Sequence, residues 1–262
     1  MTSMDRTDAV VIMAEVLGVN RAWIAANPMK ILTETQDAQI DMLGAQRAMG
    51  RPVAYLLNRR EFYGRDFALD SAVLIPRPET ETLVEAALAR MAPKDSFLDL
   101  GTGSGAVAVT LACQRPEARG TATDTSDAAL RVARANAQRH HCADRVELLR
   151  GDWYEPVGER RFDVIVSNPP YIAAPDPHLA RGDLRFEPRE ALTDGSADGL
   201  ASIRAIVAGA AGHLKPGGWL LIEHGYDQAP AVREILGAAG FSGLVSIPDL
   251  AGIPRVAGGK LD

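Results

Sequence analysis

The sequence predicts an α/β protein with a mostly parallel, twisted sheet, preceded by a small helical domain and a β-hairpin linker. From residue 97 to residue 247, short apolar runs alternate with longer segments of helical periodicity. This alternation is typical of a parallel sheet covered on both faces. Apolar residues near the N-terminus recur only at helical spacing. The length of 262 residues is enough for one α/β domain of about 180 to 200 residues and a smaller module.

The N-terminal part of the chain has the periodicity of a small helical domain. Apolar residues recur at helical spacing from residue 8 to residue 49, and Gly18 and Asn27-Pro28 interrupt the pattern. A further short helix is expected at residues 51–57. Residues 61–69 suggest two short strands around Gly64. These patterns divide the chain into a helical domain (1–58), a hairpin linker (59–76) and a larger domain (77–262).

The larger domain is expected to alternate strands and helices almost to its end. Strands are predicted at residues 97–100, 121–123, 146–149, 162–167 and 219–223, and near 244–247. Helices are predicted from residue 106 to 113 and at 126–139, 200–213 and 229–239. Residues 171–198 have little periodicity and are rich in Pro, Asp and Gly. This segment is therefore expected to be a long loop with a function.

A glycine-rich segment at residues 99–105 follows the first strand of this domain and opens a helix. Glycines at such a position let a ligand approach the backbone closely. Gly101, Gly103 and Ala106 also satisfy the dinucleotide pattern G-x-G-x-x-A, so a nicotinamide dehydrogenase is one alternative. Asp124, at the end of the second strand, fits an acceptor for ribose hydroxyls in either case.

Three features favour S-adenosylmethionine over a dinucleotide. Asp99 stands two positions before the first glycine, where it would repel a pyrophosphate but orient the ammonium group of a methionine moiety. Asp152 and Trp153 follow the third strand and supply a carboxylate and an indole for adenine. The fourth strand ends in Asn168-Pro169-Pro170-Tyr171 (NPPY) rather than in a catalytic dehydrogenase residue. Asp99 and Asp124 have a simpler alternative as helix caps, and Trp153 as a packing residue.

The NPPY segment suits a planar NH2 group. The Asn168 side-chain oxygen accepts one amino proton, and the prolines fix an extended path that turns a backbone carbonyl toward the second. The Tyr171 ring supplies an apolar wall and a negative π-face. The segment therefore predicts methyl transfer to a planar amino nitrogen. The alternative is that Asn-Pro marks a turn after a strand.

Several longer motifs extend this pattern along the chain. They are PVAY (52–55), EFYG (61–64), LIPRPETE (74–81), DLGTGSG (99–105), NPPYI (168–172), FEP (186–188), AL (191–192), DGL (198–200) and EHG (223–225). Together they make the chain similar to the protein release factor glutamine methyltransferases, class I enzymes with a Rossmann-like fold. PRPETE beside NPPYI is specific to this family and its closest relatives, whereas DNA amino-methyltransferases share NPPY. Asn58 departs from the family, which usually has glycine there.

The resemblance implies transfer of a methyl group from S-adenosylmethionine to the side-chain amide nitrogen (N5) of the glutamine in the Gly-Gly-Gln motif of peptide chain release factors. The cofactor contacts it implies are Gly101, Thr102, Gly103, Ser104, Gly105, Asp124, Trp153 and Asn168. It places the acceptor glutamine against Asn168, Pro169, Pro170 and Tyr171. Of these, Asn168, Pro169 and Tyr171 are the predicted catalytic residues, and the 1–58 domain is the predicted docking domain.

Composition limits the other possibilities. A formal charge of −6 and a pI near 5.4 argue against extended binding to a phosphate backbone, and so against a DNA adenine-N6 methyltransferase. A ribosomal-protein glutamine methyltransferase stays open, because only its docking surface would differ. No signal-peptide pattern or long apolar run is present, so we expect a cytoplasmic protein without a membrane contact. The two cysteines form no disulfide framework or metal motif, and no metal site is expected.

Five charged residues of the family motifs receive no definite role from the sequence. They are Arg77, Glu79, Glu81, Glu187 and Glu223. The first three either shape the rim of the acceptor pocket or form surface ion pairs, and the same alternatives apply to the other two.

Overall fold

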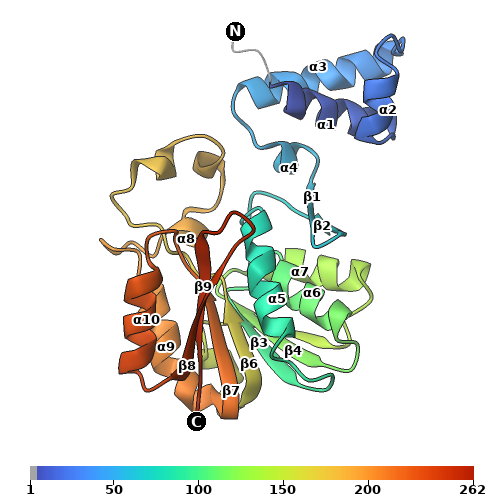
Figure 1. The fold of residues 1–262 in the computed structure, drawn as a ribbon. Coiled ribbons are helices and arrows are strands. Elements are labelled where there is room, and N and C mark those ends of the chain that lie inside the picture. The colour runs from blue at the N-terminus through green and yellow to red at the C-terminus, as the bar shows by residue number, and fades with distance from the viewer. Residues whose placement is uncertain (1–4) are drawn as a thin grey trace.

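The computed structural model describes residues 5–262, so the first four residues of the predicted 1–58 domain lie outside the described residues. An N-terminal helical module stands at one end of the molecule, and a small hairpin connects it to the larger α/β part (Figure 1). The predicted architecture is therefore confirmed. The predicted domain boundaries remain predictions.

The N-terminal module contains α1 (Arg6–Leu17), α2 (Arg21–Ala26), α3 (Glu34–Ala48) and the short α4 (Val53–Leu56). Local signals set the helix ends. Gly18 ends α1 in the left-handed region at φ 65°, and Asn20 caps α2 by accepting from the Trp23 N–H. Thr33 and Gln36 form a capping box at the start of α3. The module encloses a small core of buried side chains: Ile12, Leu43 and Leu56.

The hairpin pairs β1 (Arg59–Phe62) with β2 (Arg65–Ala68) in antiparallel register. Tyr63 and Gly64 form its two-residue turn, both at positive φ, as right-twisted strands require. Phe62 and Phe67 are buried against the larger domain. Asn58, just before β1, has φ 53°. Glycine adopts this left-handed conformation at least cost, and Asn is among the other residues that tolerate it best.

The large sheet has the order β5-β4-β3-β6-β7-β9-β8. Its parallel part consists of β3 (Ser96–Leu100), β4 (Arg119–Asp124), β5 (Val146–Arg150), β6 (Phe162–Ser167) and β7 (Leu214–Glu223). These strands confirm the five predicted ones, although β7 begins five residues before the predicted residue 219. The carboxyl ends of β3, β4 and β6 lie side by side, which is where ligands bind in such sheets.

The C-terminal edge of the sheet differs from the prediction. Only a strand near residues 244–247 was expected, but β8 (Ser242–Pro248) is joined by β9 (Pro254–Lys260), which is inserted between β7 and β8 in antiparallel pairing. Periodicity missed β9 because its centre is Ala257-Gly258-Gly259, without alternating large side chains. The glycine is required there, since a Cβ on Gly258 would lie 2.5 Å from the Leu220 carbonyl oxygen.

Helices cover both faces of the sheet (Figure 1). Buried side chains of α5 (Glu81–Leu88) and α6 (Ala106–Gln114), with the end of α7 (Asp127–Arg139), form one core cluster, and those of α9 (Ala201–His213) and α10 (Ala229–Ala238) form the other. The sequence prediction missed α5. The apolar side chains of α5 are buried in the first cluster. No helix of the described residues is long and apolar enough to cross a membrane.

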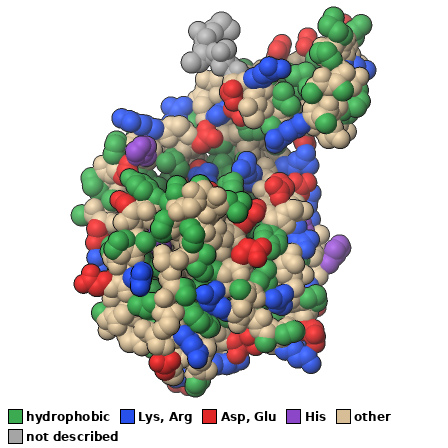
Figure 2. Space-filling model, in the orientation of Figure 1, with side chains coloured by type: hydrophobic (Ala, Val, Ile, Leu, Met, Phe, Trp, Pro, Cys, Tyr) green, Lys and Arg blue, Asp and Glu red, His purple; other side chains and the backbone are tan. Residues whose placement is uncertain are grey.

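The predicted loop at 171–198 is confirmed as mostly irregular, with short helical turns at Pro177–Ala180, Leu184–Phe186 and α8 (Arg189–Leu192). It reaches back to the N-terminal module. Arg47 of α3 forms ion pairs with Asp8 and with Asp183 of the loop, and Arg185 donates to the Met49 carbonyl oxygen. Figure 2 shows this loop region and the module on either side of a hollow above the α/β part.

Candidate active site

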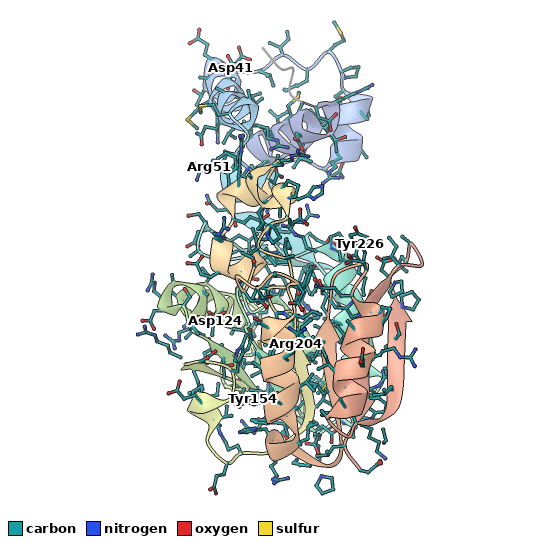
Figure 3. The ribbon with its side chains drawn as sticks, turned by 90° about the vertical axis from the view of Figure 1, so that its left-hand side faces the viewer. Asp41, Arg51, Asp124, Tyr154, Arg204 and Tyr226 are labelled. Carbon is teal, nitrogen blue, oxygen red and sulfur yellow. The ribbon has the colours of Figure 1, made fainter. Side chains whose placement is uncertain are left out.

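A cavity of about 780 Å³ opens at the carboxyl ends of β3, β4 and β6. Figure 3 labels Asp124, which lies at the end of β4 and lines it. Ten of the predicted site residues line the same cavity: Asp99, Gly101, Thr102, Gly103, Ser104, Asp124, Asp152, Trp153, Asn168 and Pro170. Gly105, Pro169 and Tyr171 are not among the lining residues.

The glycine-rich loop, residues 101–105, owes its shape to three positive φ angles. Gly101, Gly103 and Gly105 have φ 69°, 55° and 79°, which only glycine adopts at little cost. A Cβ on Gly105 would approach the Ala133 backbone to 3.2 Å, so this glycine lets α6 pack against α7. A Cβ on Gly103 would meet nothing within 4 Å. Gly103 therefore presents bare backbone at the cavity.

Asp99 holds the glycine-rich loop onto α6. Its Oδ2 accepts from the Thr102 hydroxyl at 2.7 Å and from the Ala108 N–H at 3.2 Å. Burial raises the pKa of Asp99 to about 6, although both hydrogen bonds favour the charged form. These contacts are those of a helix cap, which is the simpler alternative for Asp99. Contact with an ammonium group remains a prediction, made through the part of Asp99 that lines the cavity.

Asp124 ties the same loop to the start of α7. Its Oδ2 accepts from the Gly103 N–H and its Oδ1 from the Ser126 N–H, both at 2.9 Å. Burial raises the pKa of Asp124, and the two backbone hydrogen bonds oppose that shift. A carboxylate oxygen has more than one acceptor position, so Asp124 retains capacity for hydroxyl donors in the cavity.

Trp153 is held in an uncommon backbone conformation beside the loop. Its φ is 39°, which is strained for a large side chain and is typical of functional sites. Its carbonyl oxygen accepts from the Thr123 hydroxyl at 3.0 Å. The indole faces Gly101, where an added Cβ would lie 3.5 Å from Cζ3. The neighbouring Asp152 is exposed at the cavity edge.

Asn168 follows β6 and is oriented by a residue from a different part of the chain. Its Nδ2 donates to the Thr80 hydroxyl oxygen at 3.2 Å, and both residues line the cavity. The Asn168 Oδ1 makes no hydrogen bond with any described residue. Within residues 5–262, the Pro169 carbonyl oxygen likewise accepts no hydrogen bond. Two acceptors of the 168–171 segment therefore have no hydrogen-bond donor among the described residues, and of the two residues only Asn168 lines the cavity.

Tyr171 contacts the protein interior through both its hydroxyl and its ring. The hydroxyl donates to Glu223 Oε1 at 3.3 Å, and the ring packs at the edge of the second core cluster. Burial is the main reason that its pKa is raised. Glu223 is fully buried at the end of β7. Burial raises the pKa of Glu223 to about 7, opposed by the hydroxyls of Thr80 and Tyr171.

The PRPETE segment is fixed next to the loop that follows NPPY. Arg77 forms an ion pair with the buried carboxylate of Glu187, whose other oxygen accepts from the Ile75 N–H at 2.9 Å. Glu81 instead accepts from the Tyr63 N–H of the hairpin turn. Of the residues without a definite role, Arg77 and Glu187 therefore join two walls of the site, and Glu81 serves the hairpin.

Two family models match the chain. The methyltransferase small domain matches residues 78–181, and the PrmC N-terminal domain matches residues 2–57. A release factor glutamine methyltransferase of Bordetella pertussis is 52% identical over 263 residues, covering 98% of this chain and 96% of the relative. The chain belongs to the release factor glutamine methyltransferase family. Another family member, from Neisseria gonorrhoeae, is 55% identical and covers 84% of this chain and 80% of the relative.

Solved structures agree with the family's fold. A methyltransferase from Pyrococcus furiosus has a TM-score of 0.58 at 21% identity and covers 82% of this chain and 95% of its own. The Thermus thermophilus 16S rRNA N2 G1207 methyltransferase, solved with AdoMet and guanosine, has a TM-score of 0.56 at 22% identity, covering 78% and 50%. At these identities the likeness concerns the fold, and it confirms the class I methyltransferase architecture.

Thr80 is one of the cavity residues that the sequence did not single out. Thr80 lies within the PRPETE motif that defines the family, but the motif gave no reason to single out its hydroxyl. Its partner Asn168 is 88 residues away. The cofactor and substrate roles of the predicted residues stay predictions.

Proposed function

We propose that this chain transfers a methyl group from S-adenosylmethionine to the side-chain amide nitrogen of the glutamine in the Gly-Gly-Gln motif of a peptide chain release factor. The observation that carries the proposal is the position of Asn168. It lines the same cavity as the glycine-rich loop, with its NH2 group engaged by Thr80 and its oxygen available. Family membership supports the glutamine of a release factor as the acceptor.

The residues of the cavity suit S-adenosylmethionine. Gly101 and Gly103 offer bare backbone, and Trp153 offers an aromatic face beside Gly101. Asp124 would accept from ribose hydroxyls, and Asp152 from an amino group. When bound, this cofactor supplies an electrophilic methyl group on a positively charged sulfur.

The acceptor amide is a weak nucleophile, because its nitrogen lone pair is delocalised into the carbonyl group. Positioning therefore matters more than proton removal. In our proposal the Asn168 Oδ1 and the Pro169 carbonyl oxygen each accept one proton of the glutamine NH2 group. The amide nitrogen is then held at the cavity wall. Pro170, which lines the cavity, would exclude water beside it, and the Tyr171 ring would support the segment from the core side.

The N-terminal module is proposed to help dock the release factor. Its outer surface carries large exposed apolar side chains, which are Met29, Ile31, Met42 and Met49. Figure 2 shows hydrophobic side chains on this lobe. The 171–198 loop, joined to the module through Arg47, would transmit the position of the docked protein to the site. Nucleic acid is not expected as a direct partner, and a cytoplasmic location remains a prediction.

The decisive experiment incubates the protein with labelled S-adenosylmethionine and four acceptors. They are a release factor, its Gln→Ala variant in the Gly-Gly-Gln motif, ribosomal proteins, and DNA. We expect label only on the unchanged release factor, and mass spectrometry should place one methyl group on its glutamine. Label on DNA, on ribosomal proteins alone, or on the Gln→Ala factor would overturn the proposal.

A further inference from the structure

A chain of hydrogen-bonding groups lies behind the acceptor segment and ends on a buried carboxylate. The Asn168 Nδ2 donates to the Thr80 hydroxyl oxygen at 3.2 Å. Thr80 and Glu223 are both almost completely buried, with 4% and 0% exposure. The Thr80 hydroxyl lowers the pKa of the Glu223 carboxyl group, against the larger effect of burial, which raises it. Tyr171 donates to Glu223 Oε1 from the other end of the acceptor segment.

Glu223 has spare accepting capacity in this arrangement. Its Oε2 is buried without a hydrogen-bond partner among the described residues. A buried unpaired carboxylate oxygen is costly, so it strongly favours any hydroxyl that points a proton toward it. Thr80 has one proton to give, and its oxygen is then free to accept from Asn168. An ionised Glu223 would therefore set the donor and acceptor roles of Thr80 and Asn168.

The direction of the bonds decides which end of the Asn168 amide faces the cavity. An ionised carboxylate only accepts hydrogen bonds, so a Thr80 hydroxyl that donates to Glu223 is left to accept from an N–H group of Asn168, as it does here. That leaves the Asn168 Oδ1 as the acceptor for the substrate. If Glu223 carried a proton, Thr80 would be able to accept from Glu223 and donate to the Asn168 oxygen. The amide would then lose its fixed orientation.

Resting on the proposed function, we infer that Thr80 and the ionised Glu223 are positioning residues, which fix the Asn168 amide with its oxygen toward the acceptor glutamine. Neither has to touch the reacting atoms. Thr80 comes from the PRPETE segment and Glu223 from the EHG segment. The inference therefore explains why these two motifs meet behind NPPY.

The surroundings of Glu223 have opposing effects on its pKa. Burial raises its pKa most, to about 7, and the nearby Glu79 raises it further, whereas Thr80, Tyr171 and Arg255 of β9 lower it. The adjacent His224 is buried, and burial lowers its pKa, so it stays neutral near pH 7 and adds no charge. The ionised form that orients Asn168 therefore becomes populated as the pH rises through about 7, and kcat is expected to rise over the same range.

The kinetic test compares Thr80→Val, which removes the hydroxyl at similar shape, with Thr80→Ser, which keeps it. With a release factor as substrate, Thr80→Val should lower kcat about 10- to 100-fold, with little change in the affinity for S-adenosylmethionine. Thr80→Ser should retain most of the wild-type kcat. Glu223→Gln should also lower kcat and should flatten its pH profile between pH 6 and 8.5. A Thr80→Val variant with wild-type kcat would overturn the inference.

A second readout needs no turnover. The side-chain NH2 signals of Asn168, identified by their loss in Asn168→Ala, should shift with pH around 7 in the wild-type protein and stay constant in Glu223→Gln. Signals that do not respond to pH in the wild type would contradict the relay. If the wild type fails to methylate a release factor while these signals titrate, the proposed acceptor is wrong and the positioning role stands.

Discussion

The two halves of the site are built by different means. The cofactor half consists mainly of backbone from one continuous loop, shaped by Gly101, Gly103 and Gly105 at positive φ. The acceptor half consists of side chains from separate segments, which meet as Asn168, Thr80 and Glu223. Its orientation depends on the charge of one fully buried carboxylate.

This difference determines how each half tolerates change. A loop made of backbone is disturbed by an added Cβ but hardly by a change in pH. A side-chain relay is disturbed by loss of one hydroxyl or by protonation, while the fold around it stays intact. Substitutions that separate cofactor binding from turnover should therefore fall on opposite sides of the cavity.

The largest effect is expected for Asn168→Ala, which removes the acceptor oxygen. It should lower kcat about 10³-fold or more, because one positioned hydrogen-bond group at a reacting centre contributes on this scale. Binding of S-adenosylmethionine, measured by calorimetry, should weaken much less. Asn27→Ala, at an exposed helix end, is the control and should behave as wild type. Near-normal methylation by Asn168→Ala would exclude the acceptor role.

Glu223→Gln should make the protein more stable while it makes the enzyme slower. The pKa of Glu223 is raised from 4.5 to about 7 in the folded state. The stability tied to its neutral form is therefore complete below pH 4.5 and is lost as the pH rises to about 7. At pH 8 the amide should recover on the order of 3 kcal/mol of unfolding free energy. Denaturant unfolding at pH 4 and pH 8 measures this, with the exposed Glu159→Gln as control. Equal stability of Glu223→Gln and the wild type at pH 8 would mean that burial does not destabilise the ionised Glu223.

Gly103→Ala tests the cofactor half. Both Gly103 and Gly64 have positive φ and open space around an added Cβ, so alanine at either should cost about 1 kcal/mol of backbone strain. Only Gly103 lines the cavity. Its alanine variant should weaken binding of S-adenosylmethionine about 10-fold, and Gly64→Ala should leave it unchanged. Equal affinities in the two variants would show that the loop does not hold the cofactor.

The smallest effect is expected for Tyr171→Phe, which keeps the ring and removes one long hydrogen bond to Glu223. Since that hydroxyl lowers the pKa of Glu223, its loss should move the midpoint of the kcat profile to higher pH. At pH 7 kcat should fall only a few-fold. Tyr226→Phe, at an exposed side chain labelled in Figure 3, is the matched control. A midpoint that moves to lower pH would contradict the relay.

Much of the fold was predictable because apolar residues recur in the sequence at the spacing of strands and helices. The parallel strands and most helices of the large domain lie where apolar patterns placed them. Besides short helical turns, α5 and β9 were not predicted. The α5 helix follows a segment predicted to be a loop. The centre of β9 is rich in glycine because the Leu220 carbonyl oxygen leaves no room for a Cβ at Gly258. Small residues chosen for close backbone contact leave no periodic signal.

The candidate site divides in the same way. The glycine-rich loop, Asp124, Trp153 and the NPPY segment were all recognisable from the sequence, since each lies at a strand end where short motifs determine the local chemistry. The partner of Asn168 was not recognisable. Thr80 is 88 residues from it, and Glu223 is 52 residues from Tyr171.

The sequence by itself therefore determined the fold class, the family and ten of the residues that line the cavity. Only the tertiary structure decided that the Asn168 amide donates to Thr80 and that Tyr171, at the other end of the NPPY segment, donates to the buried Glu223. The physical reason is that a motif specifies backbone path and residue type over a few positions. The burial of a carboxylate, and the hydrogen bonds that burial demands, depend on which distant segments pack around it.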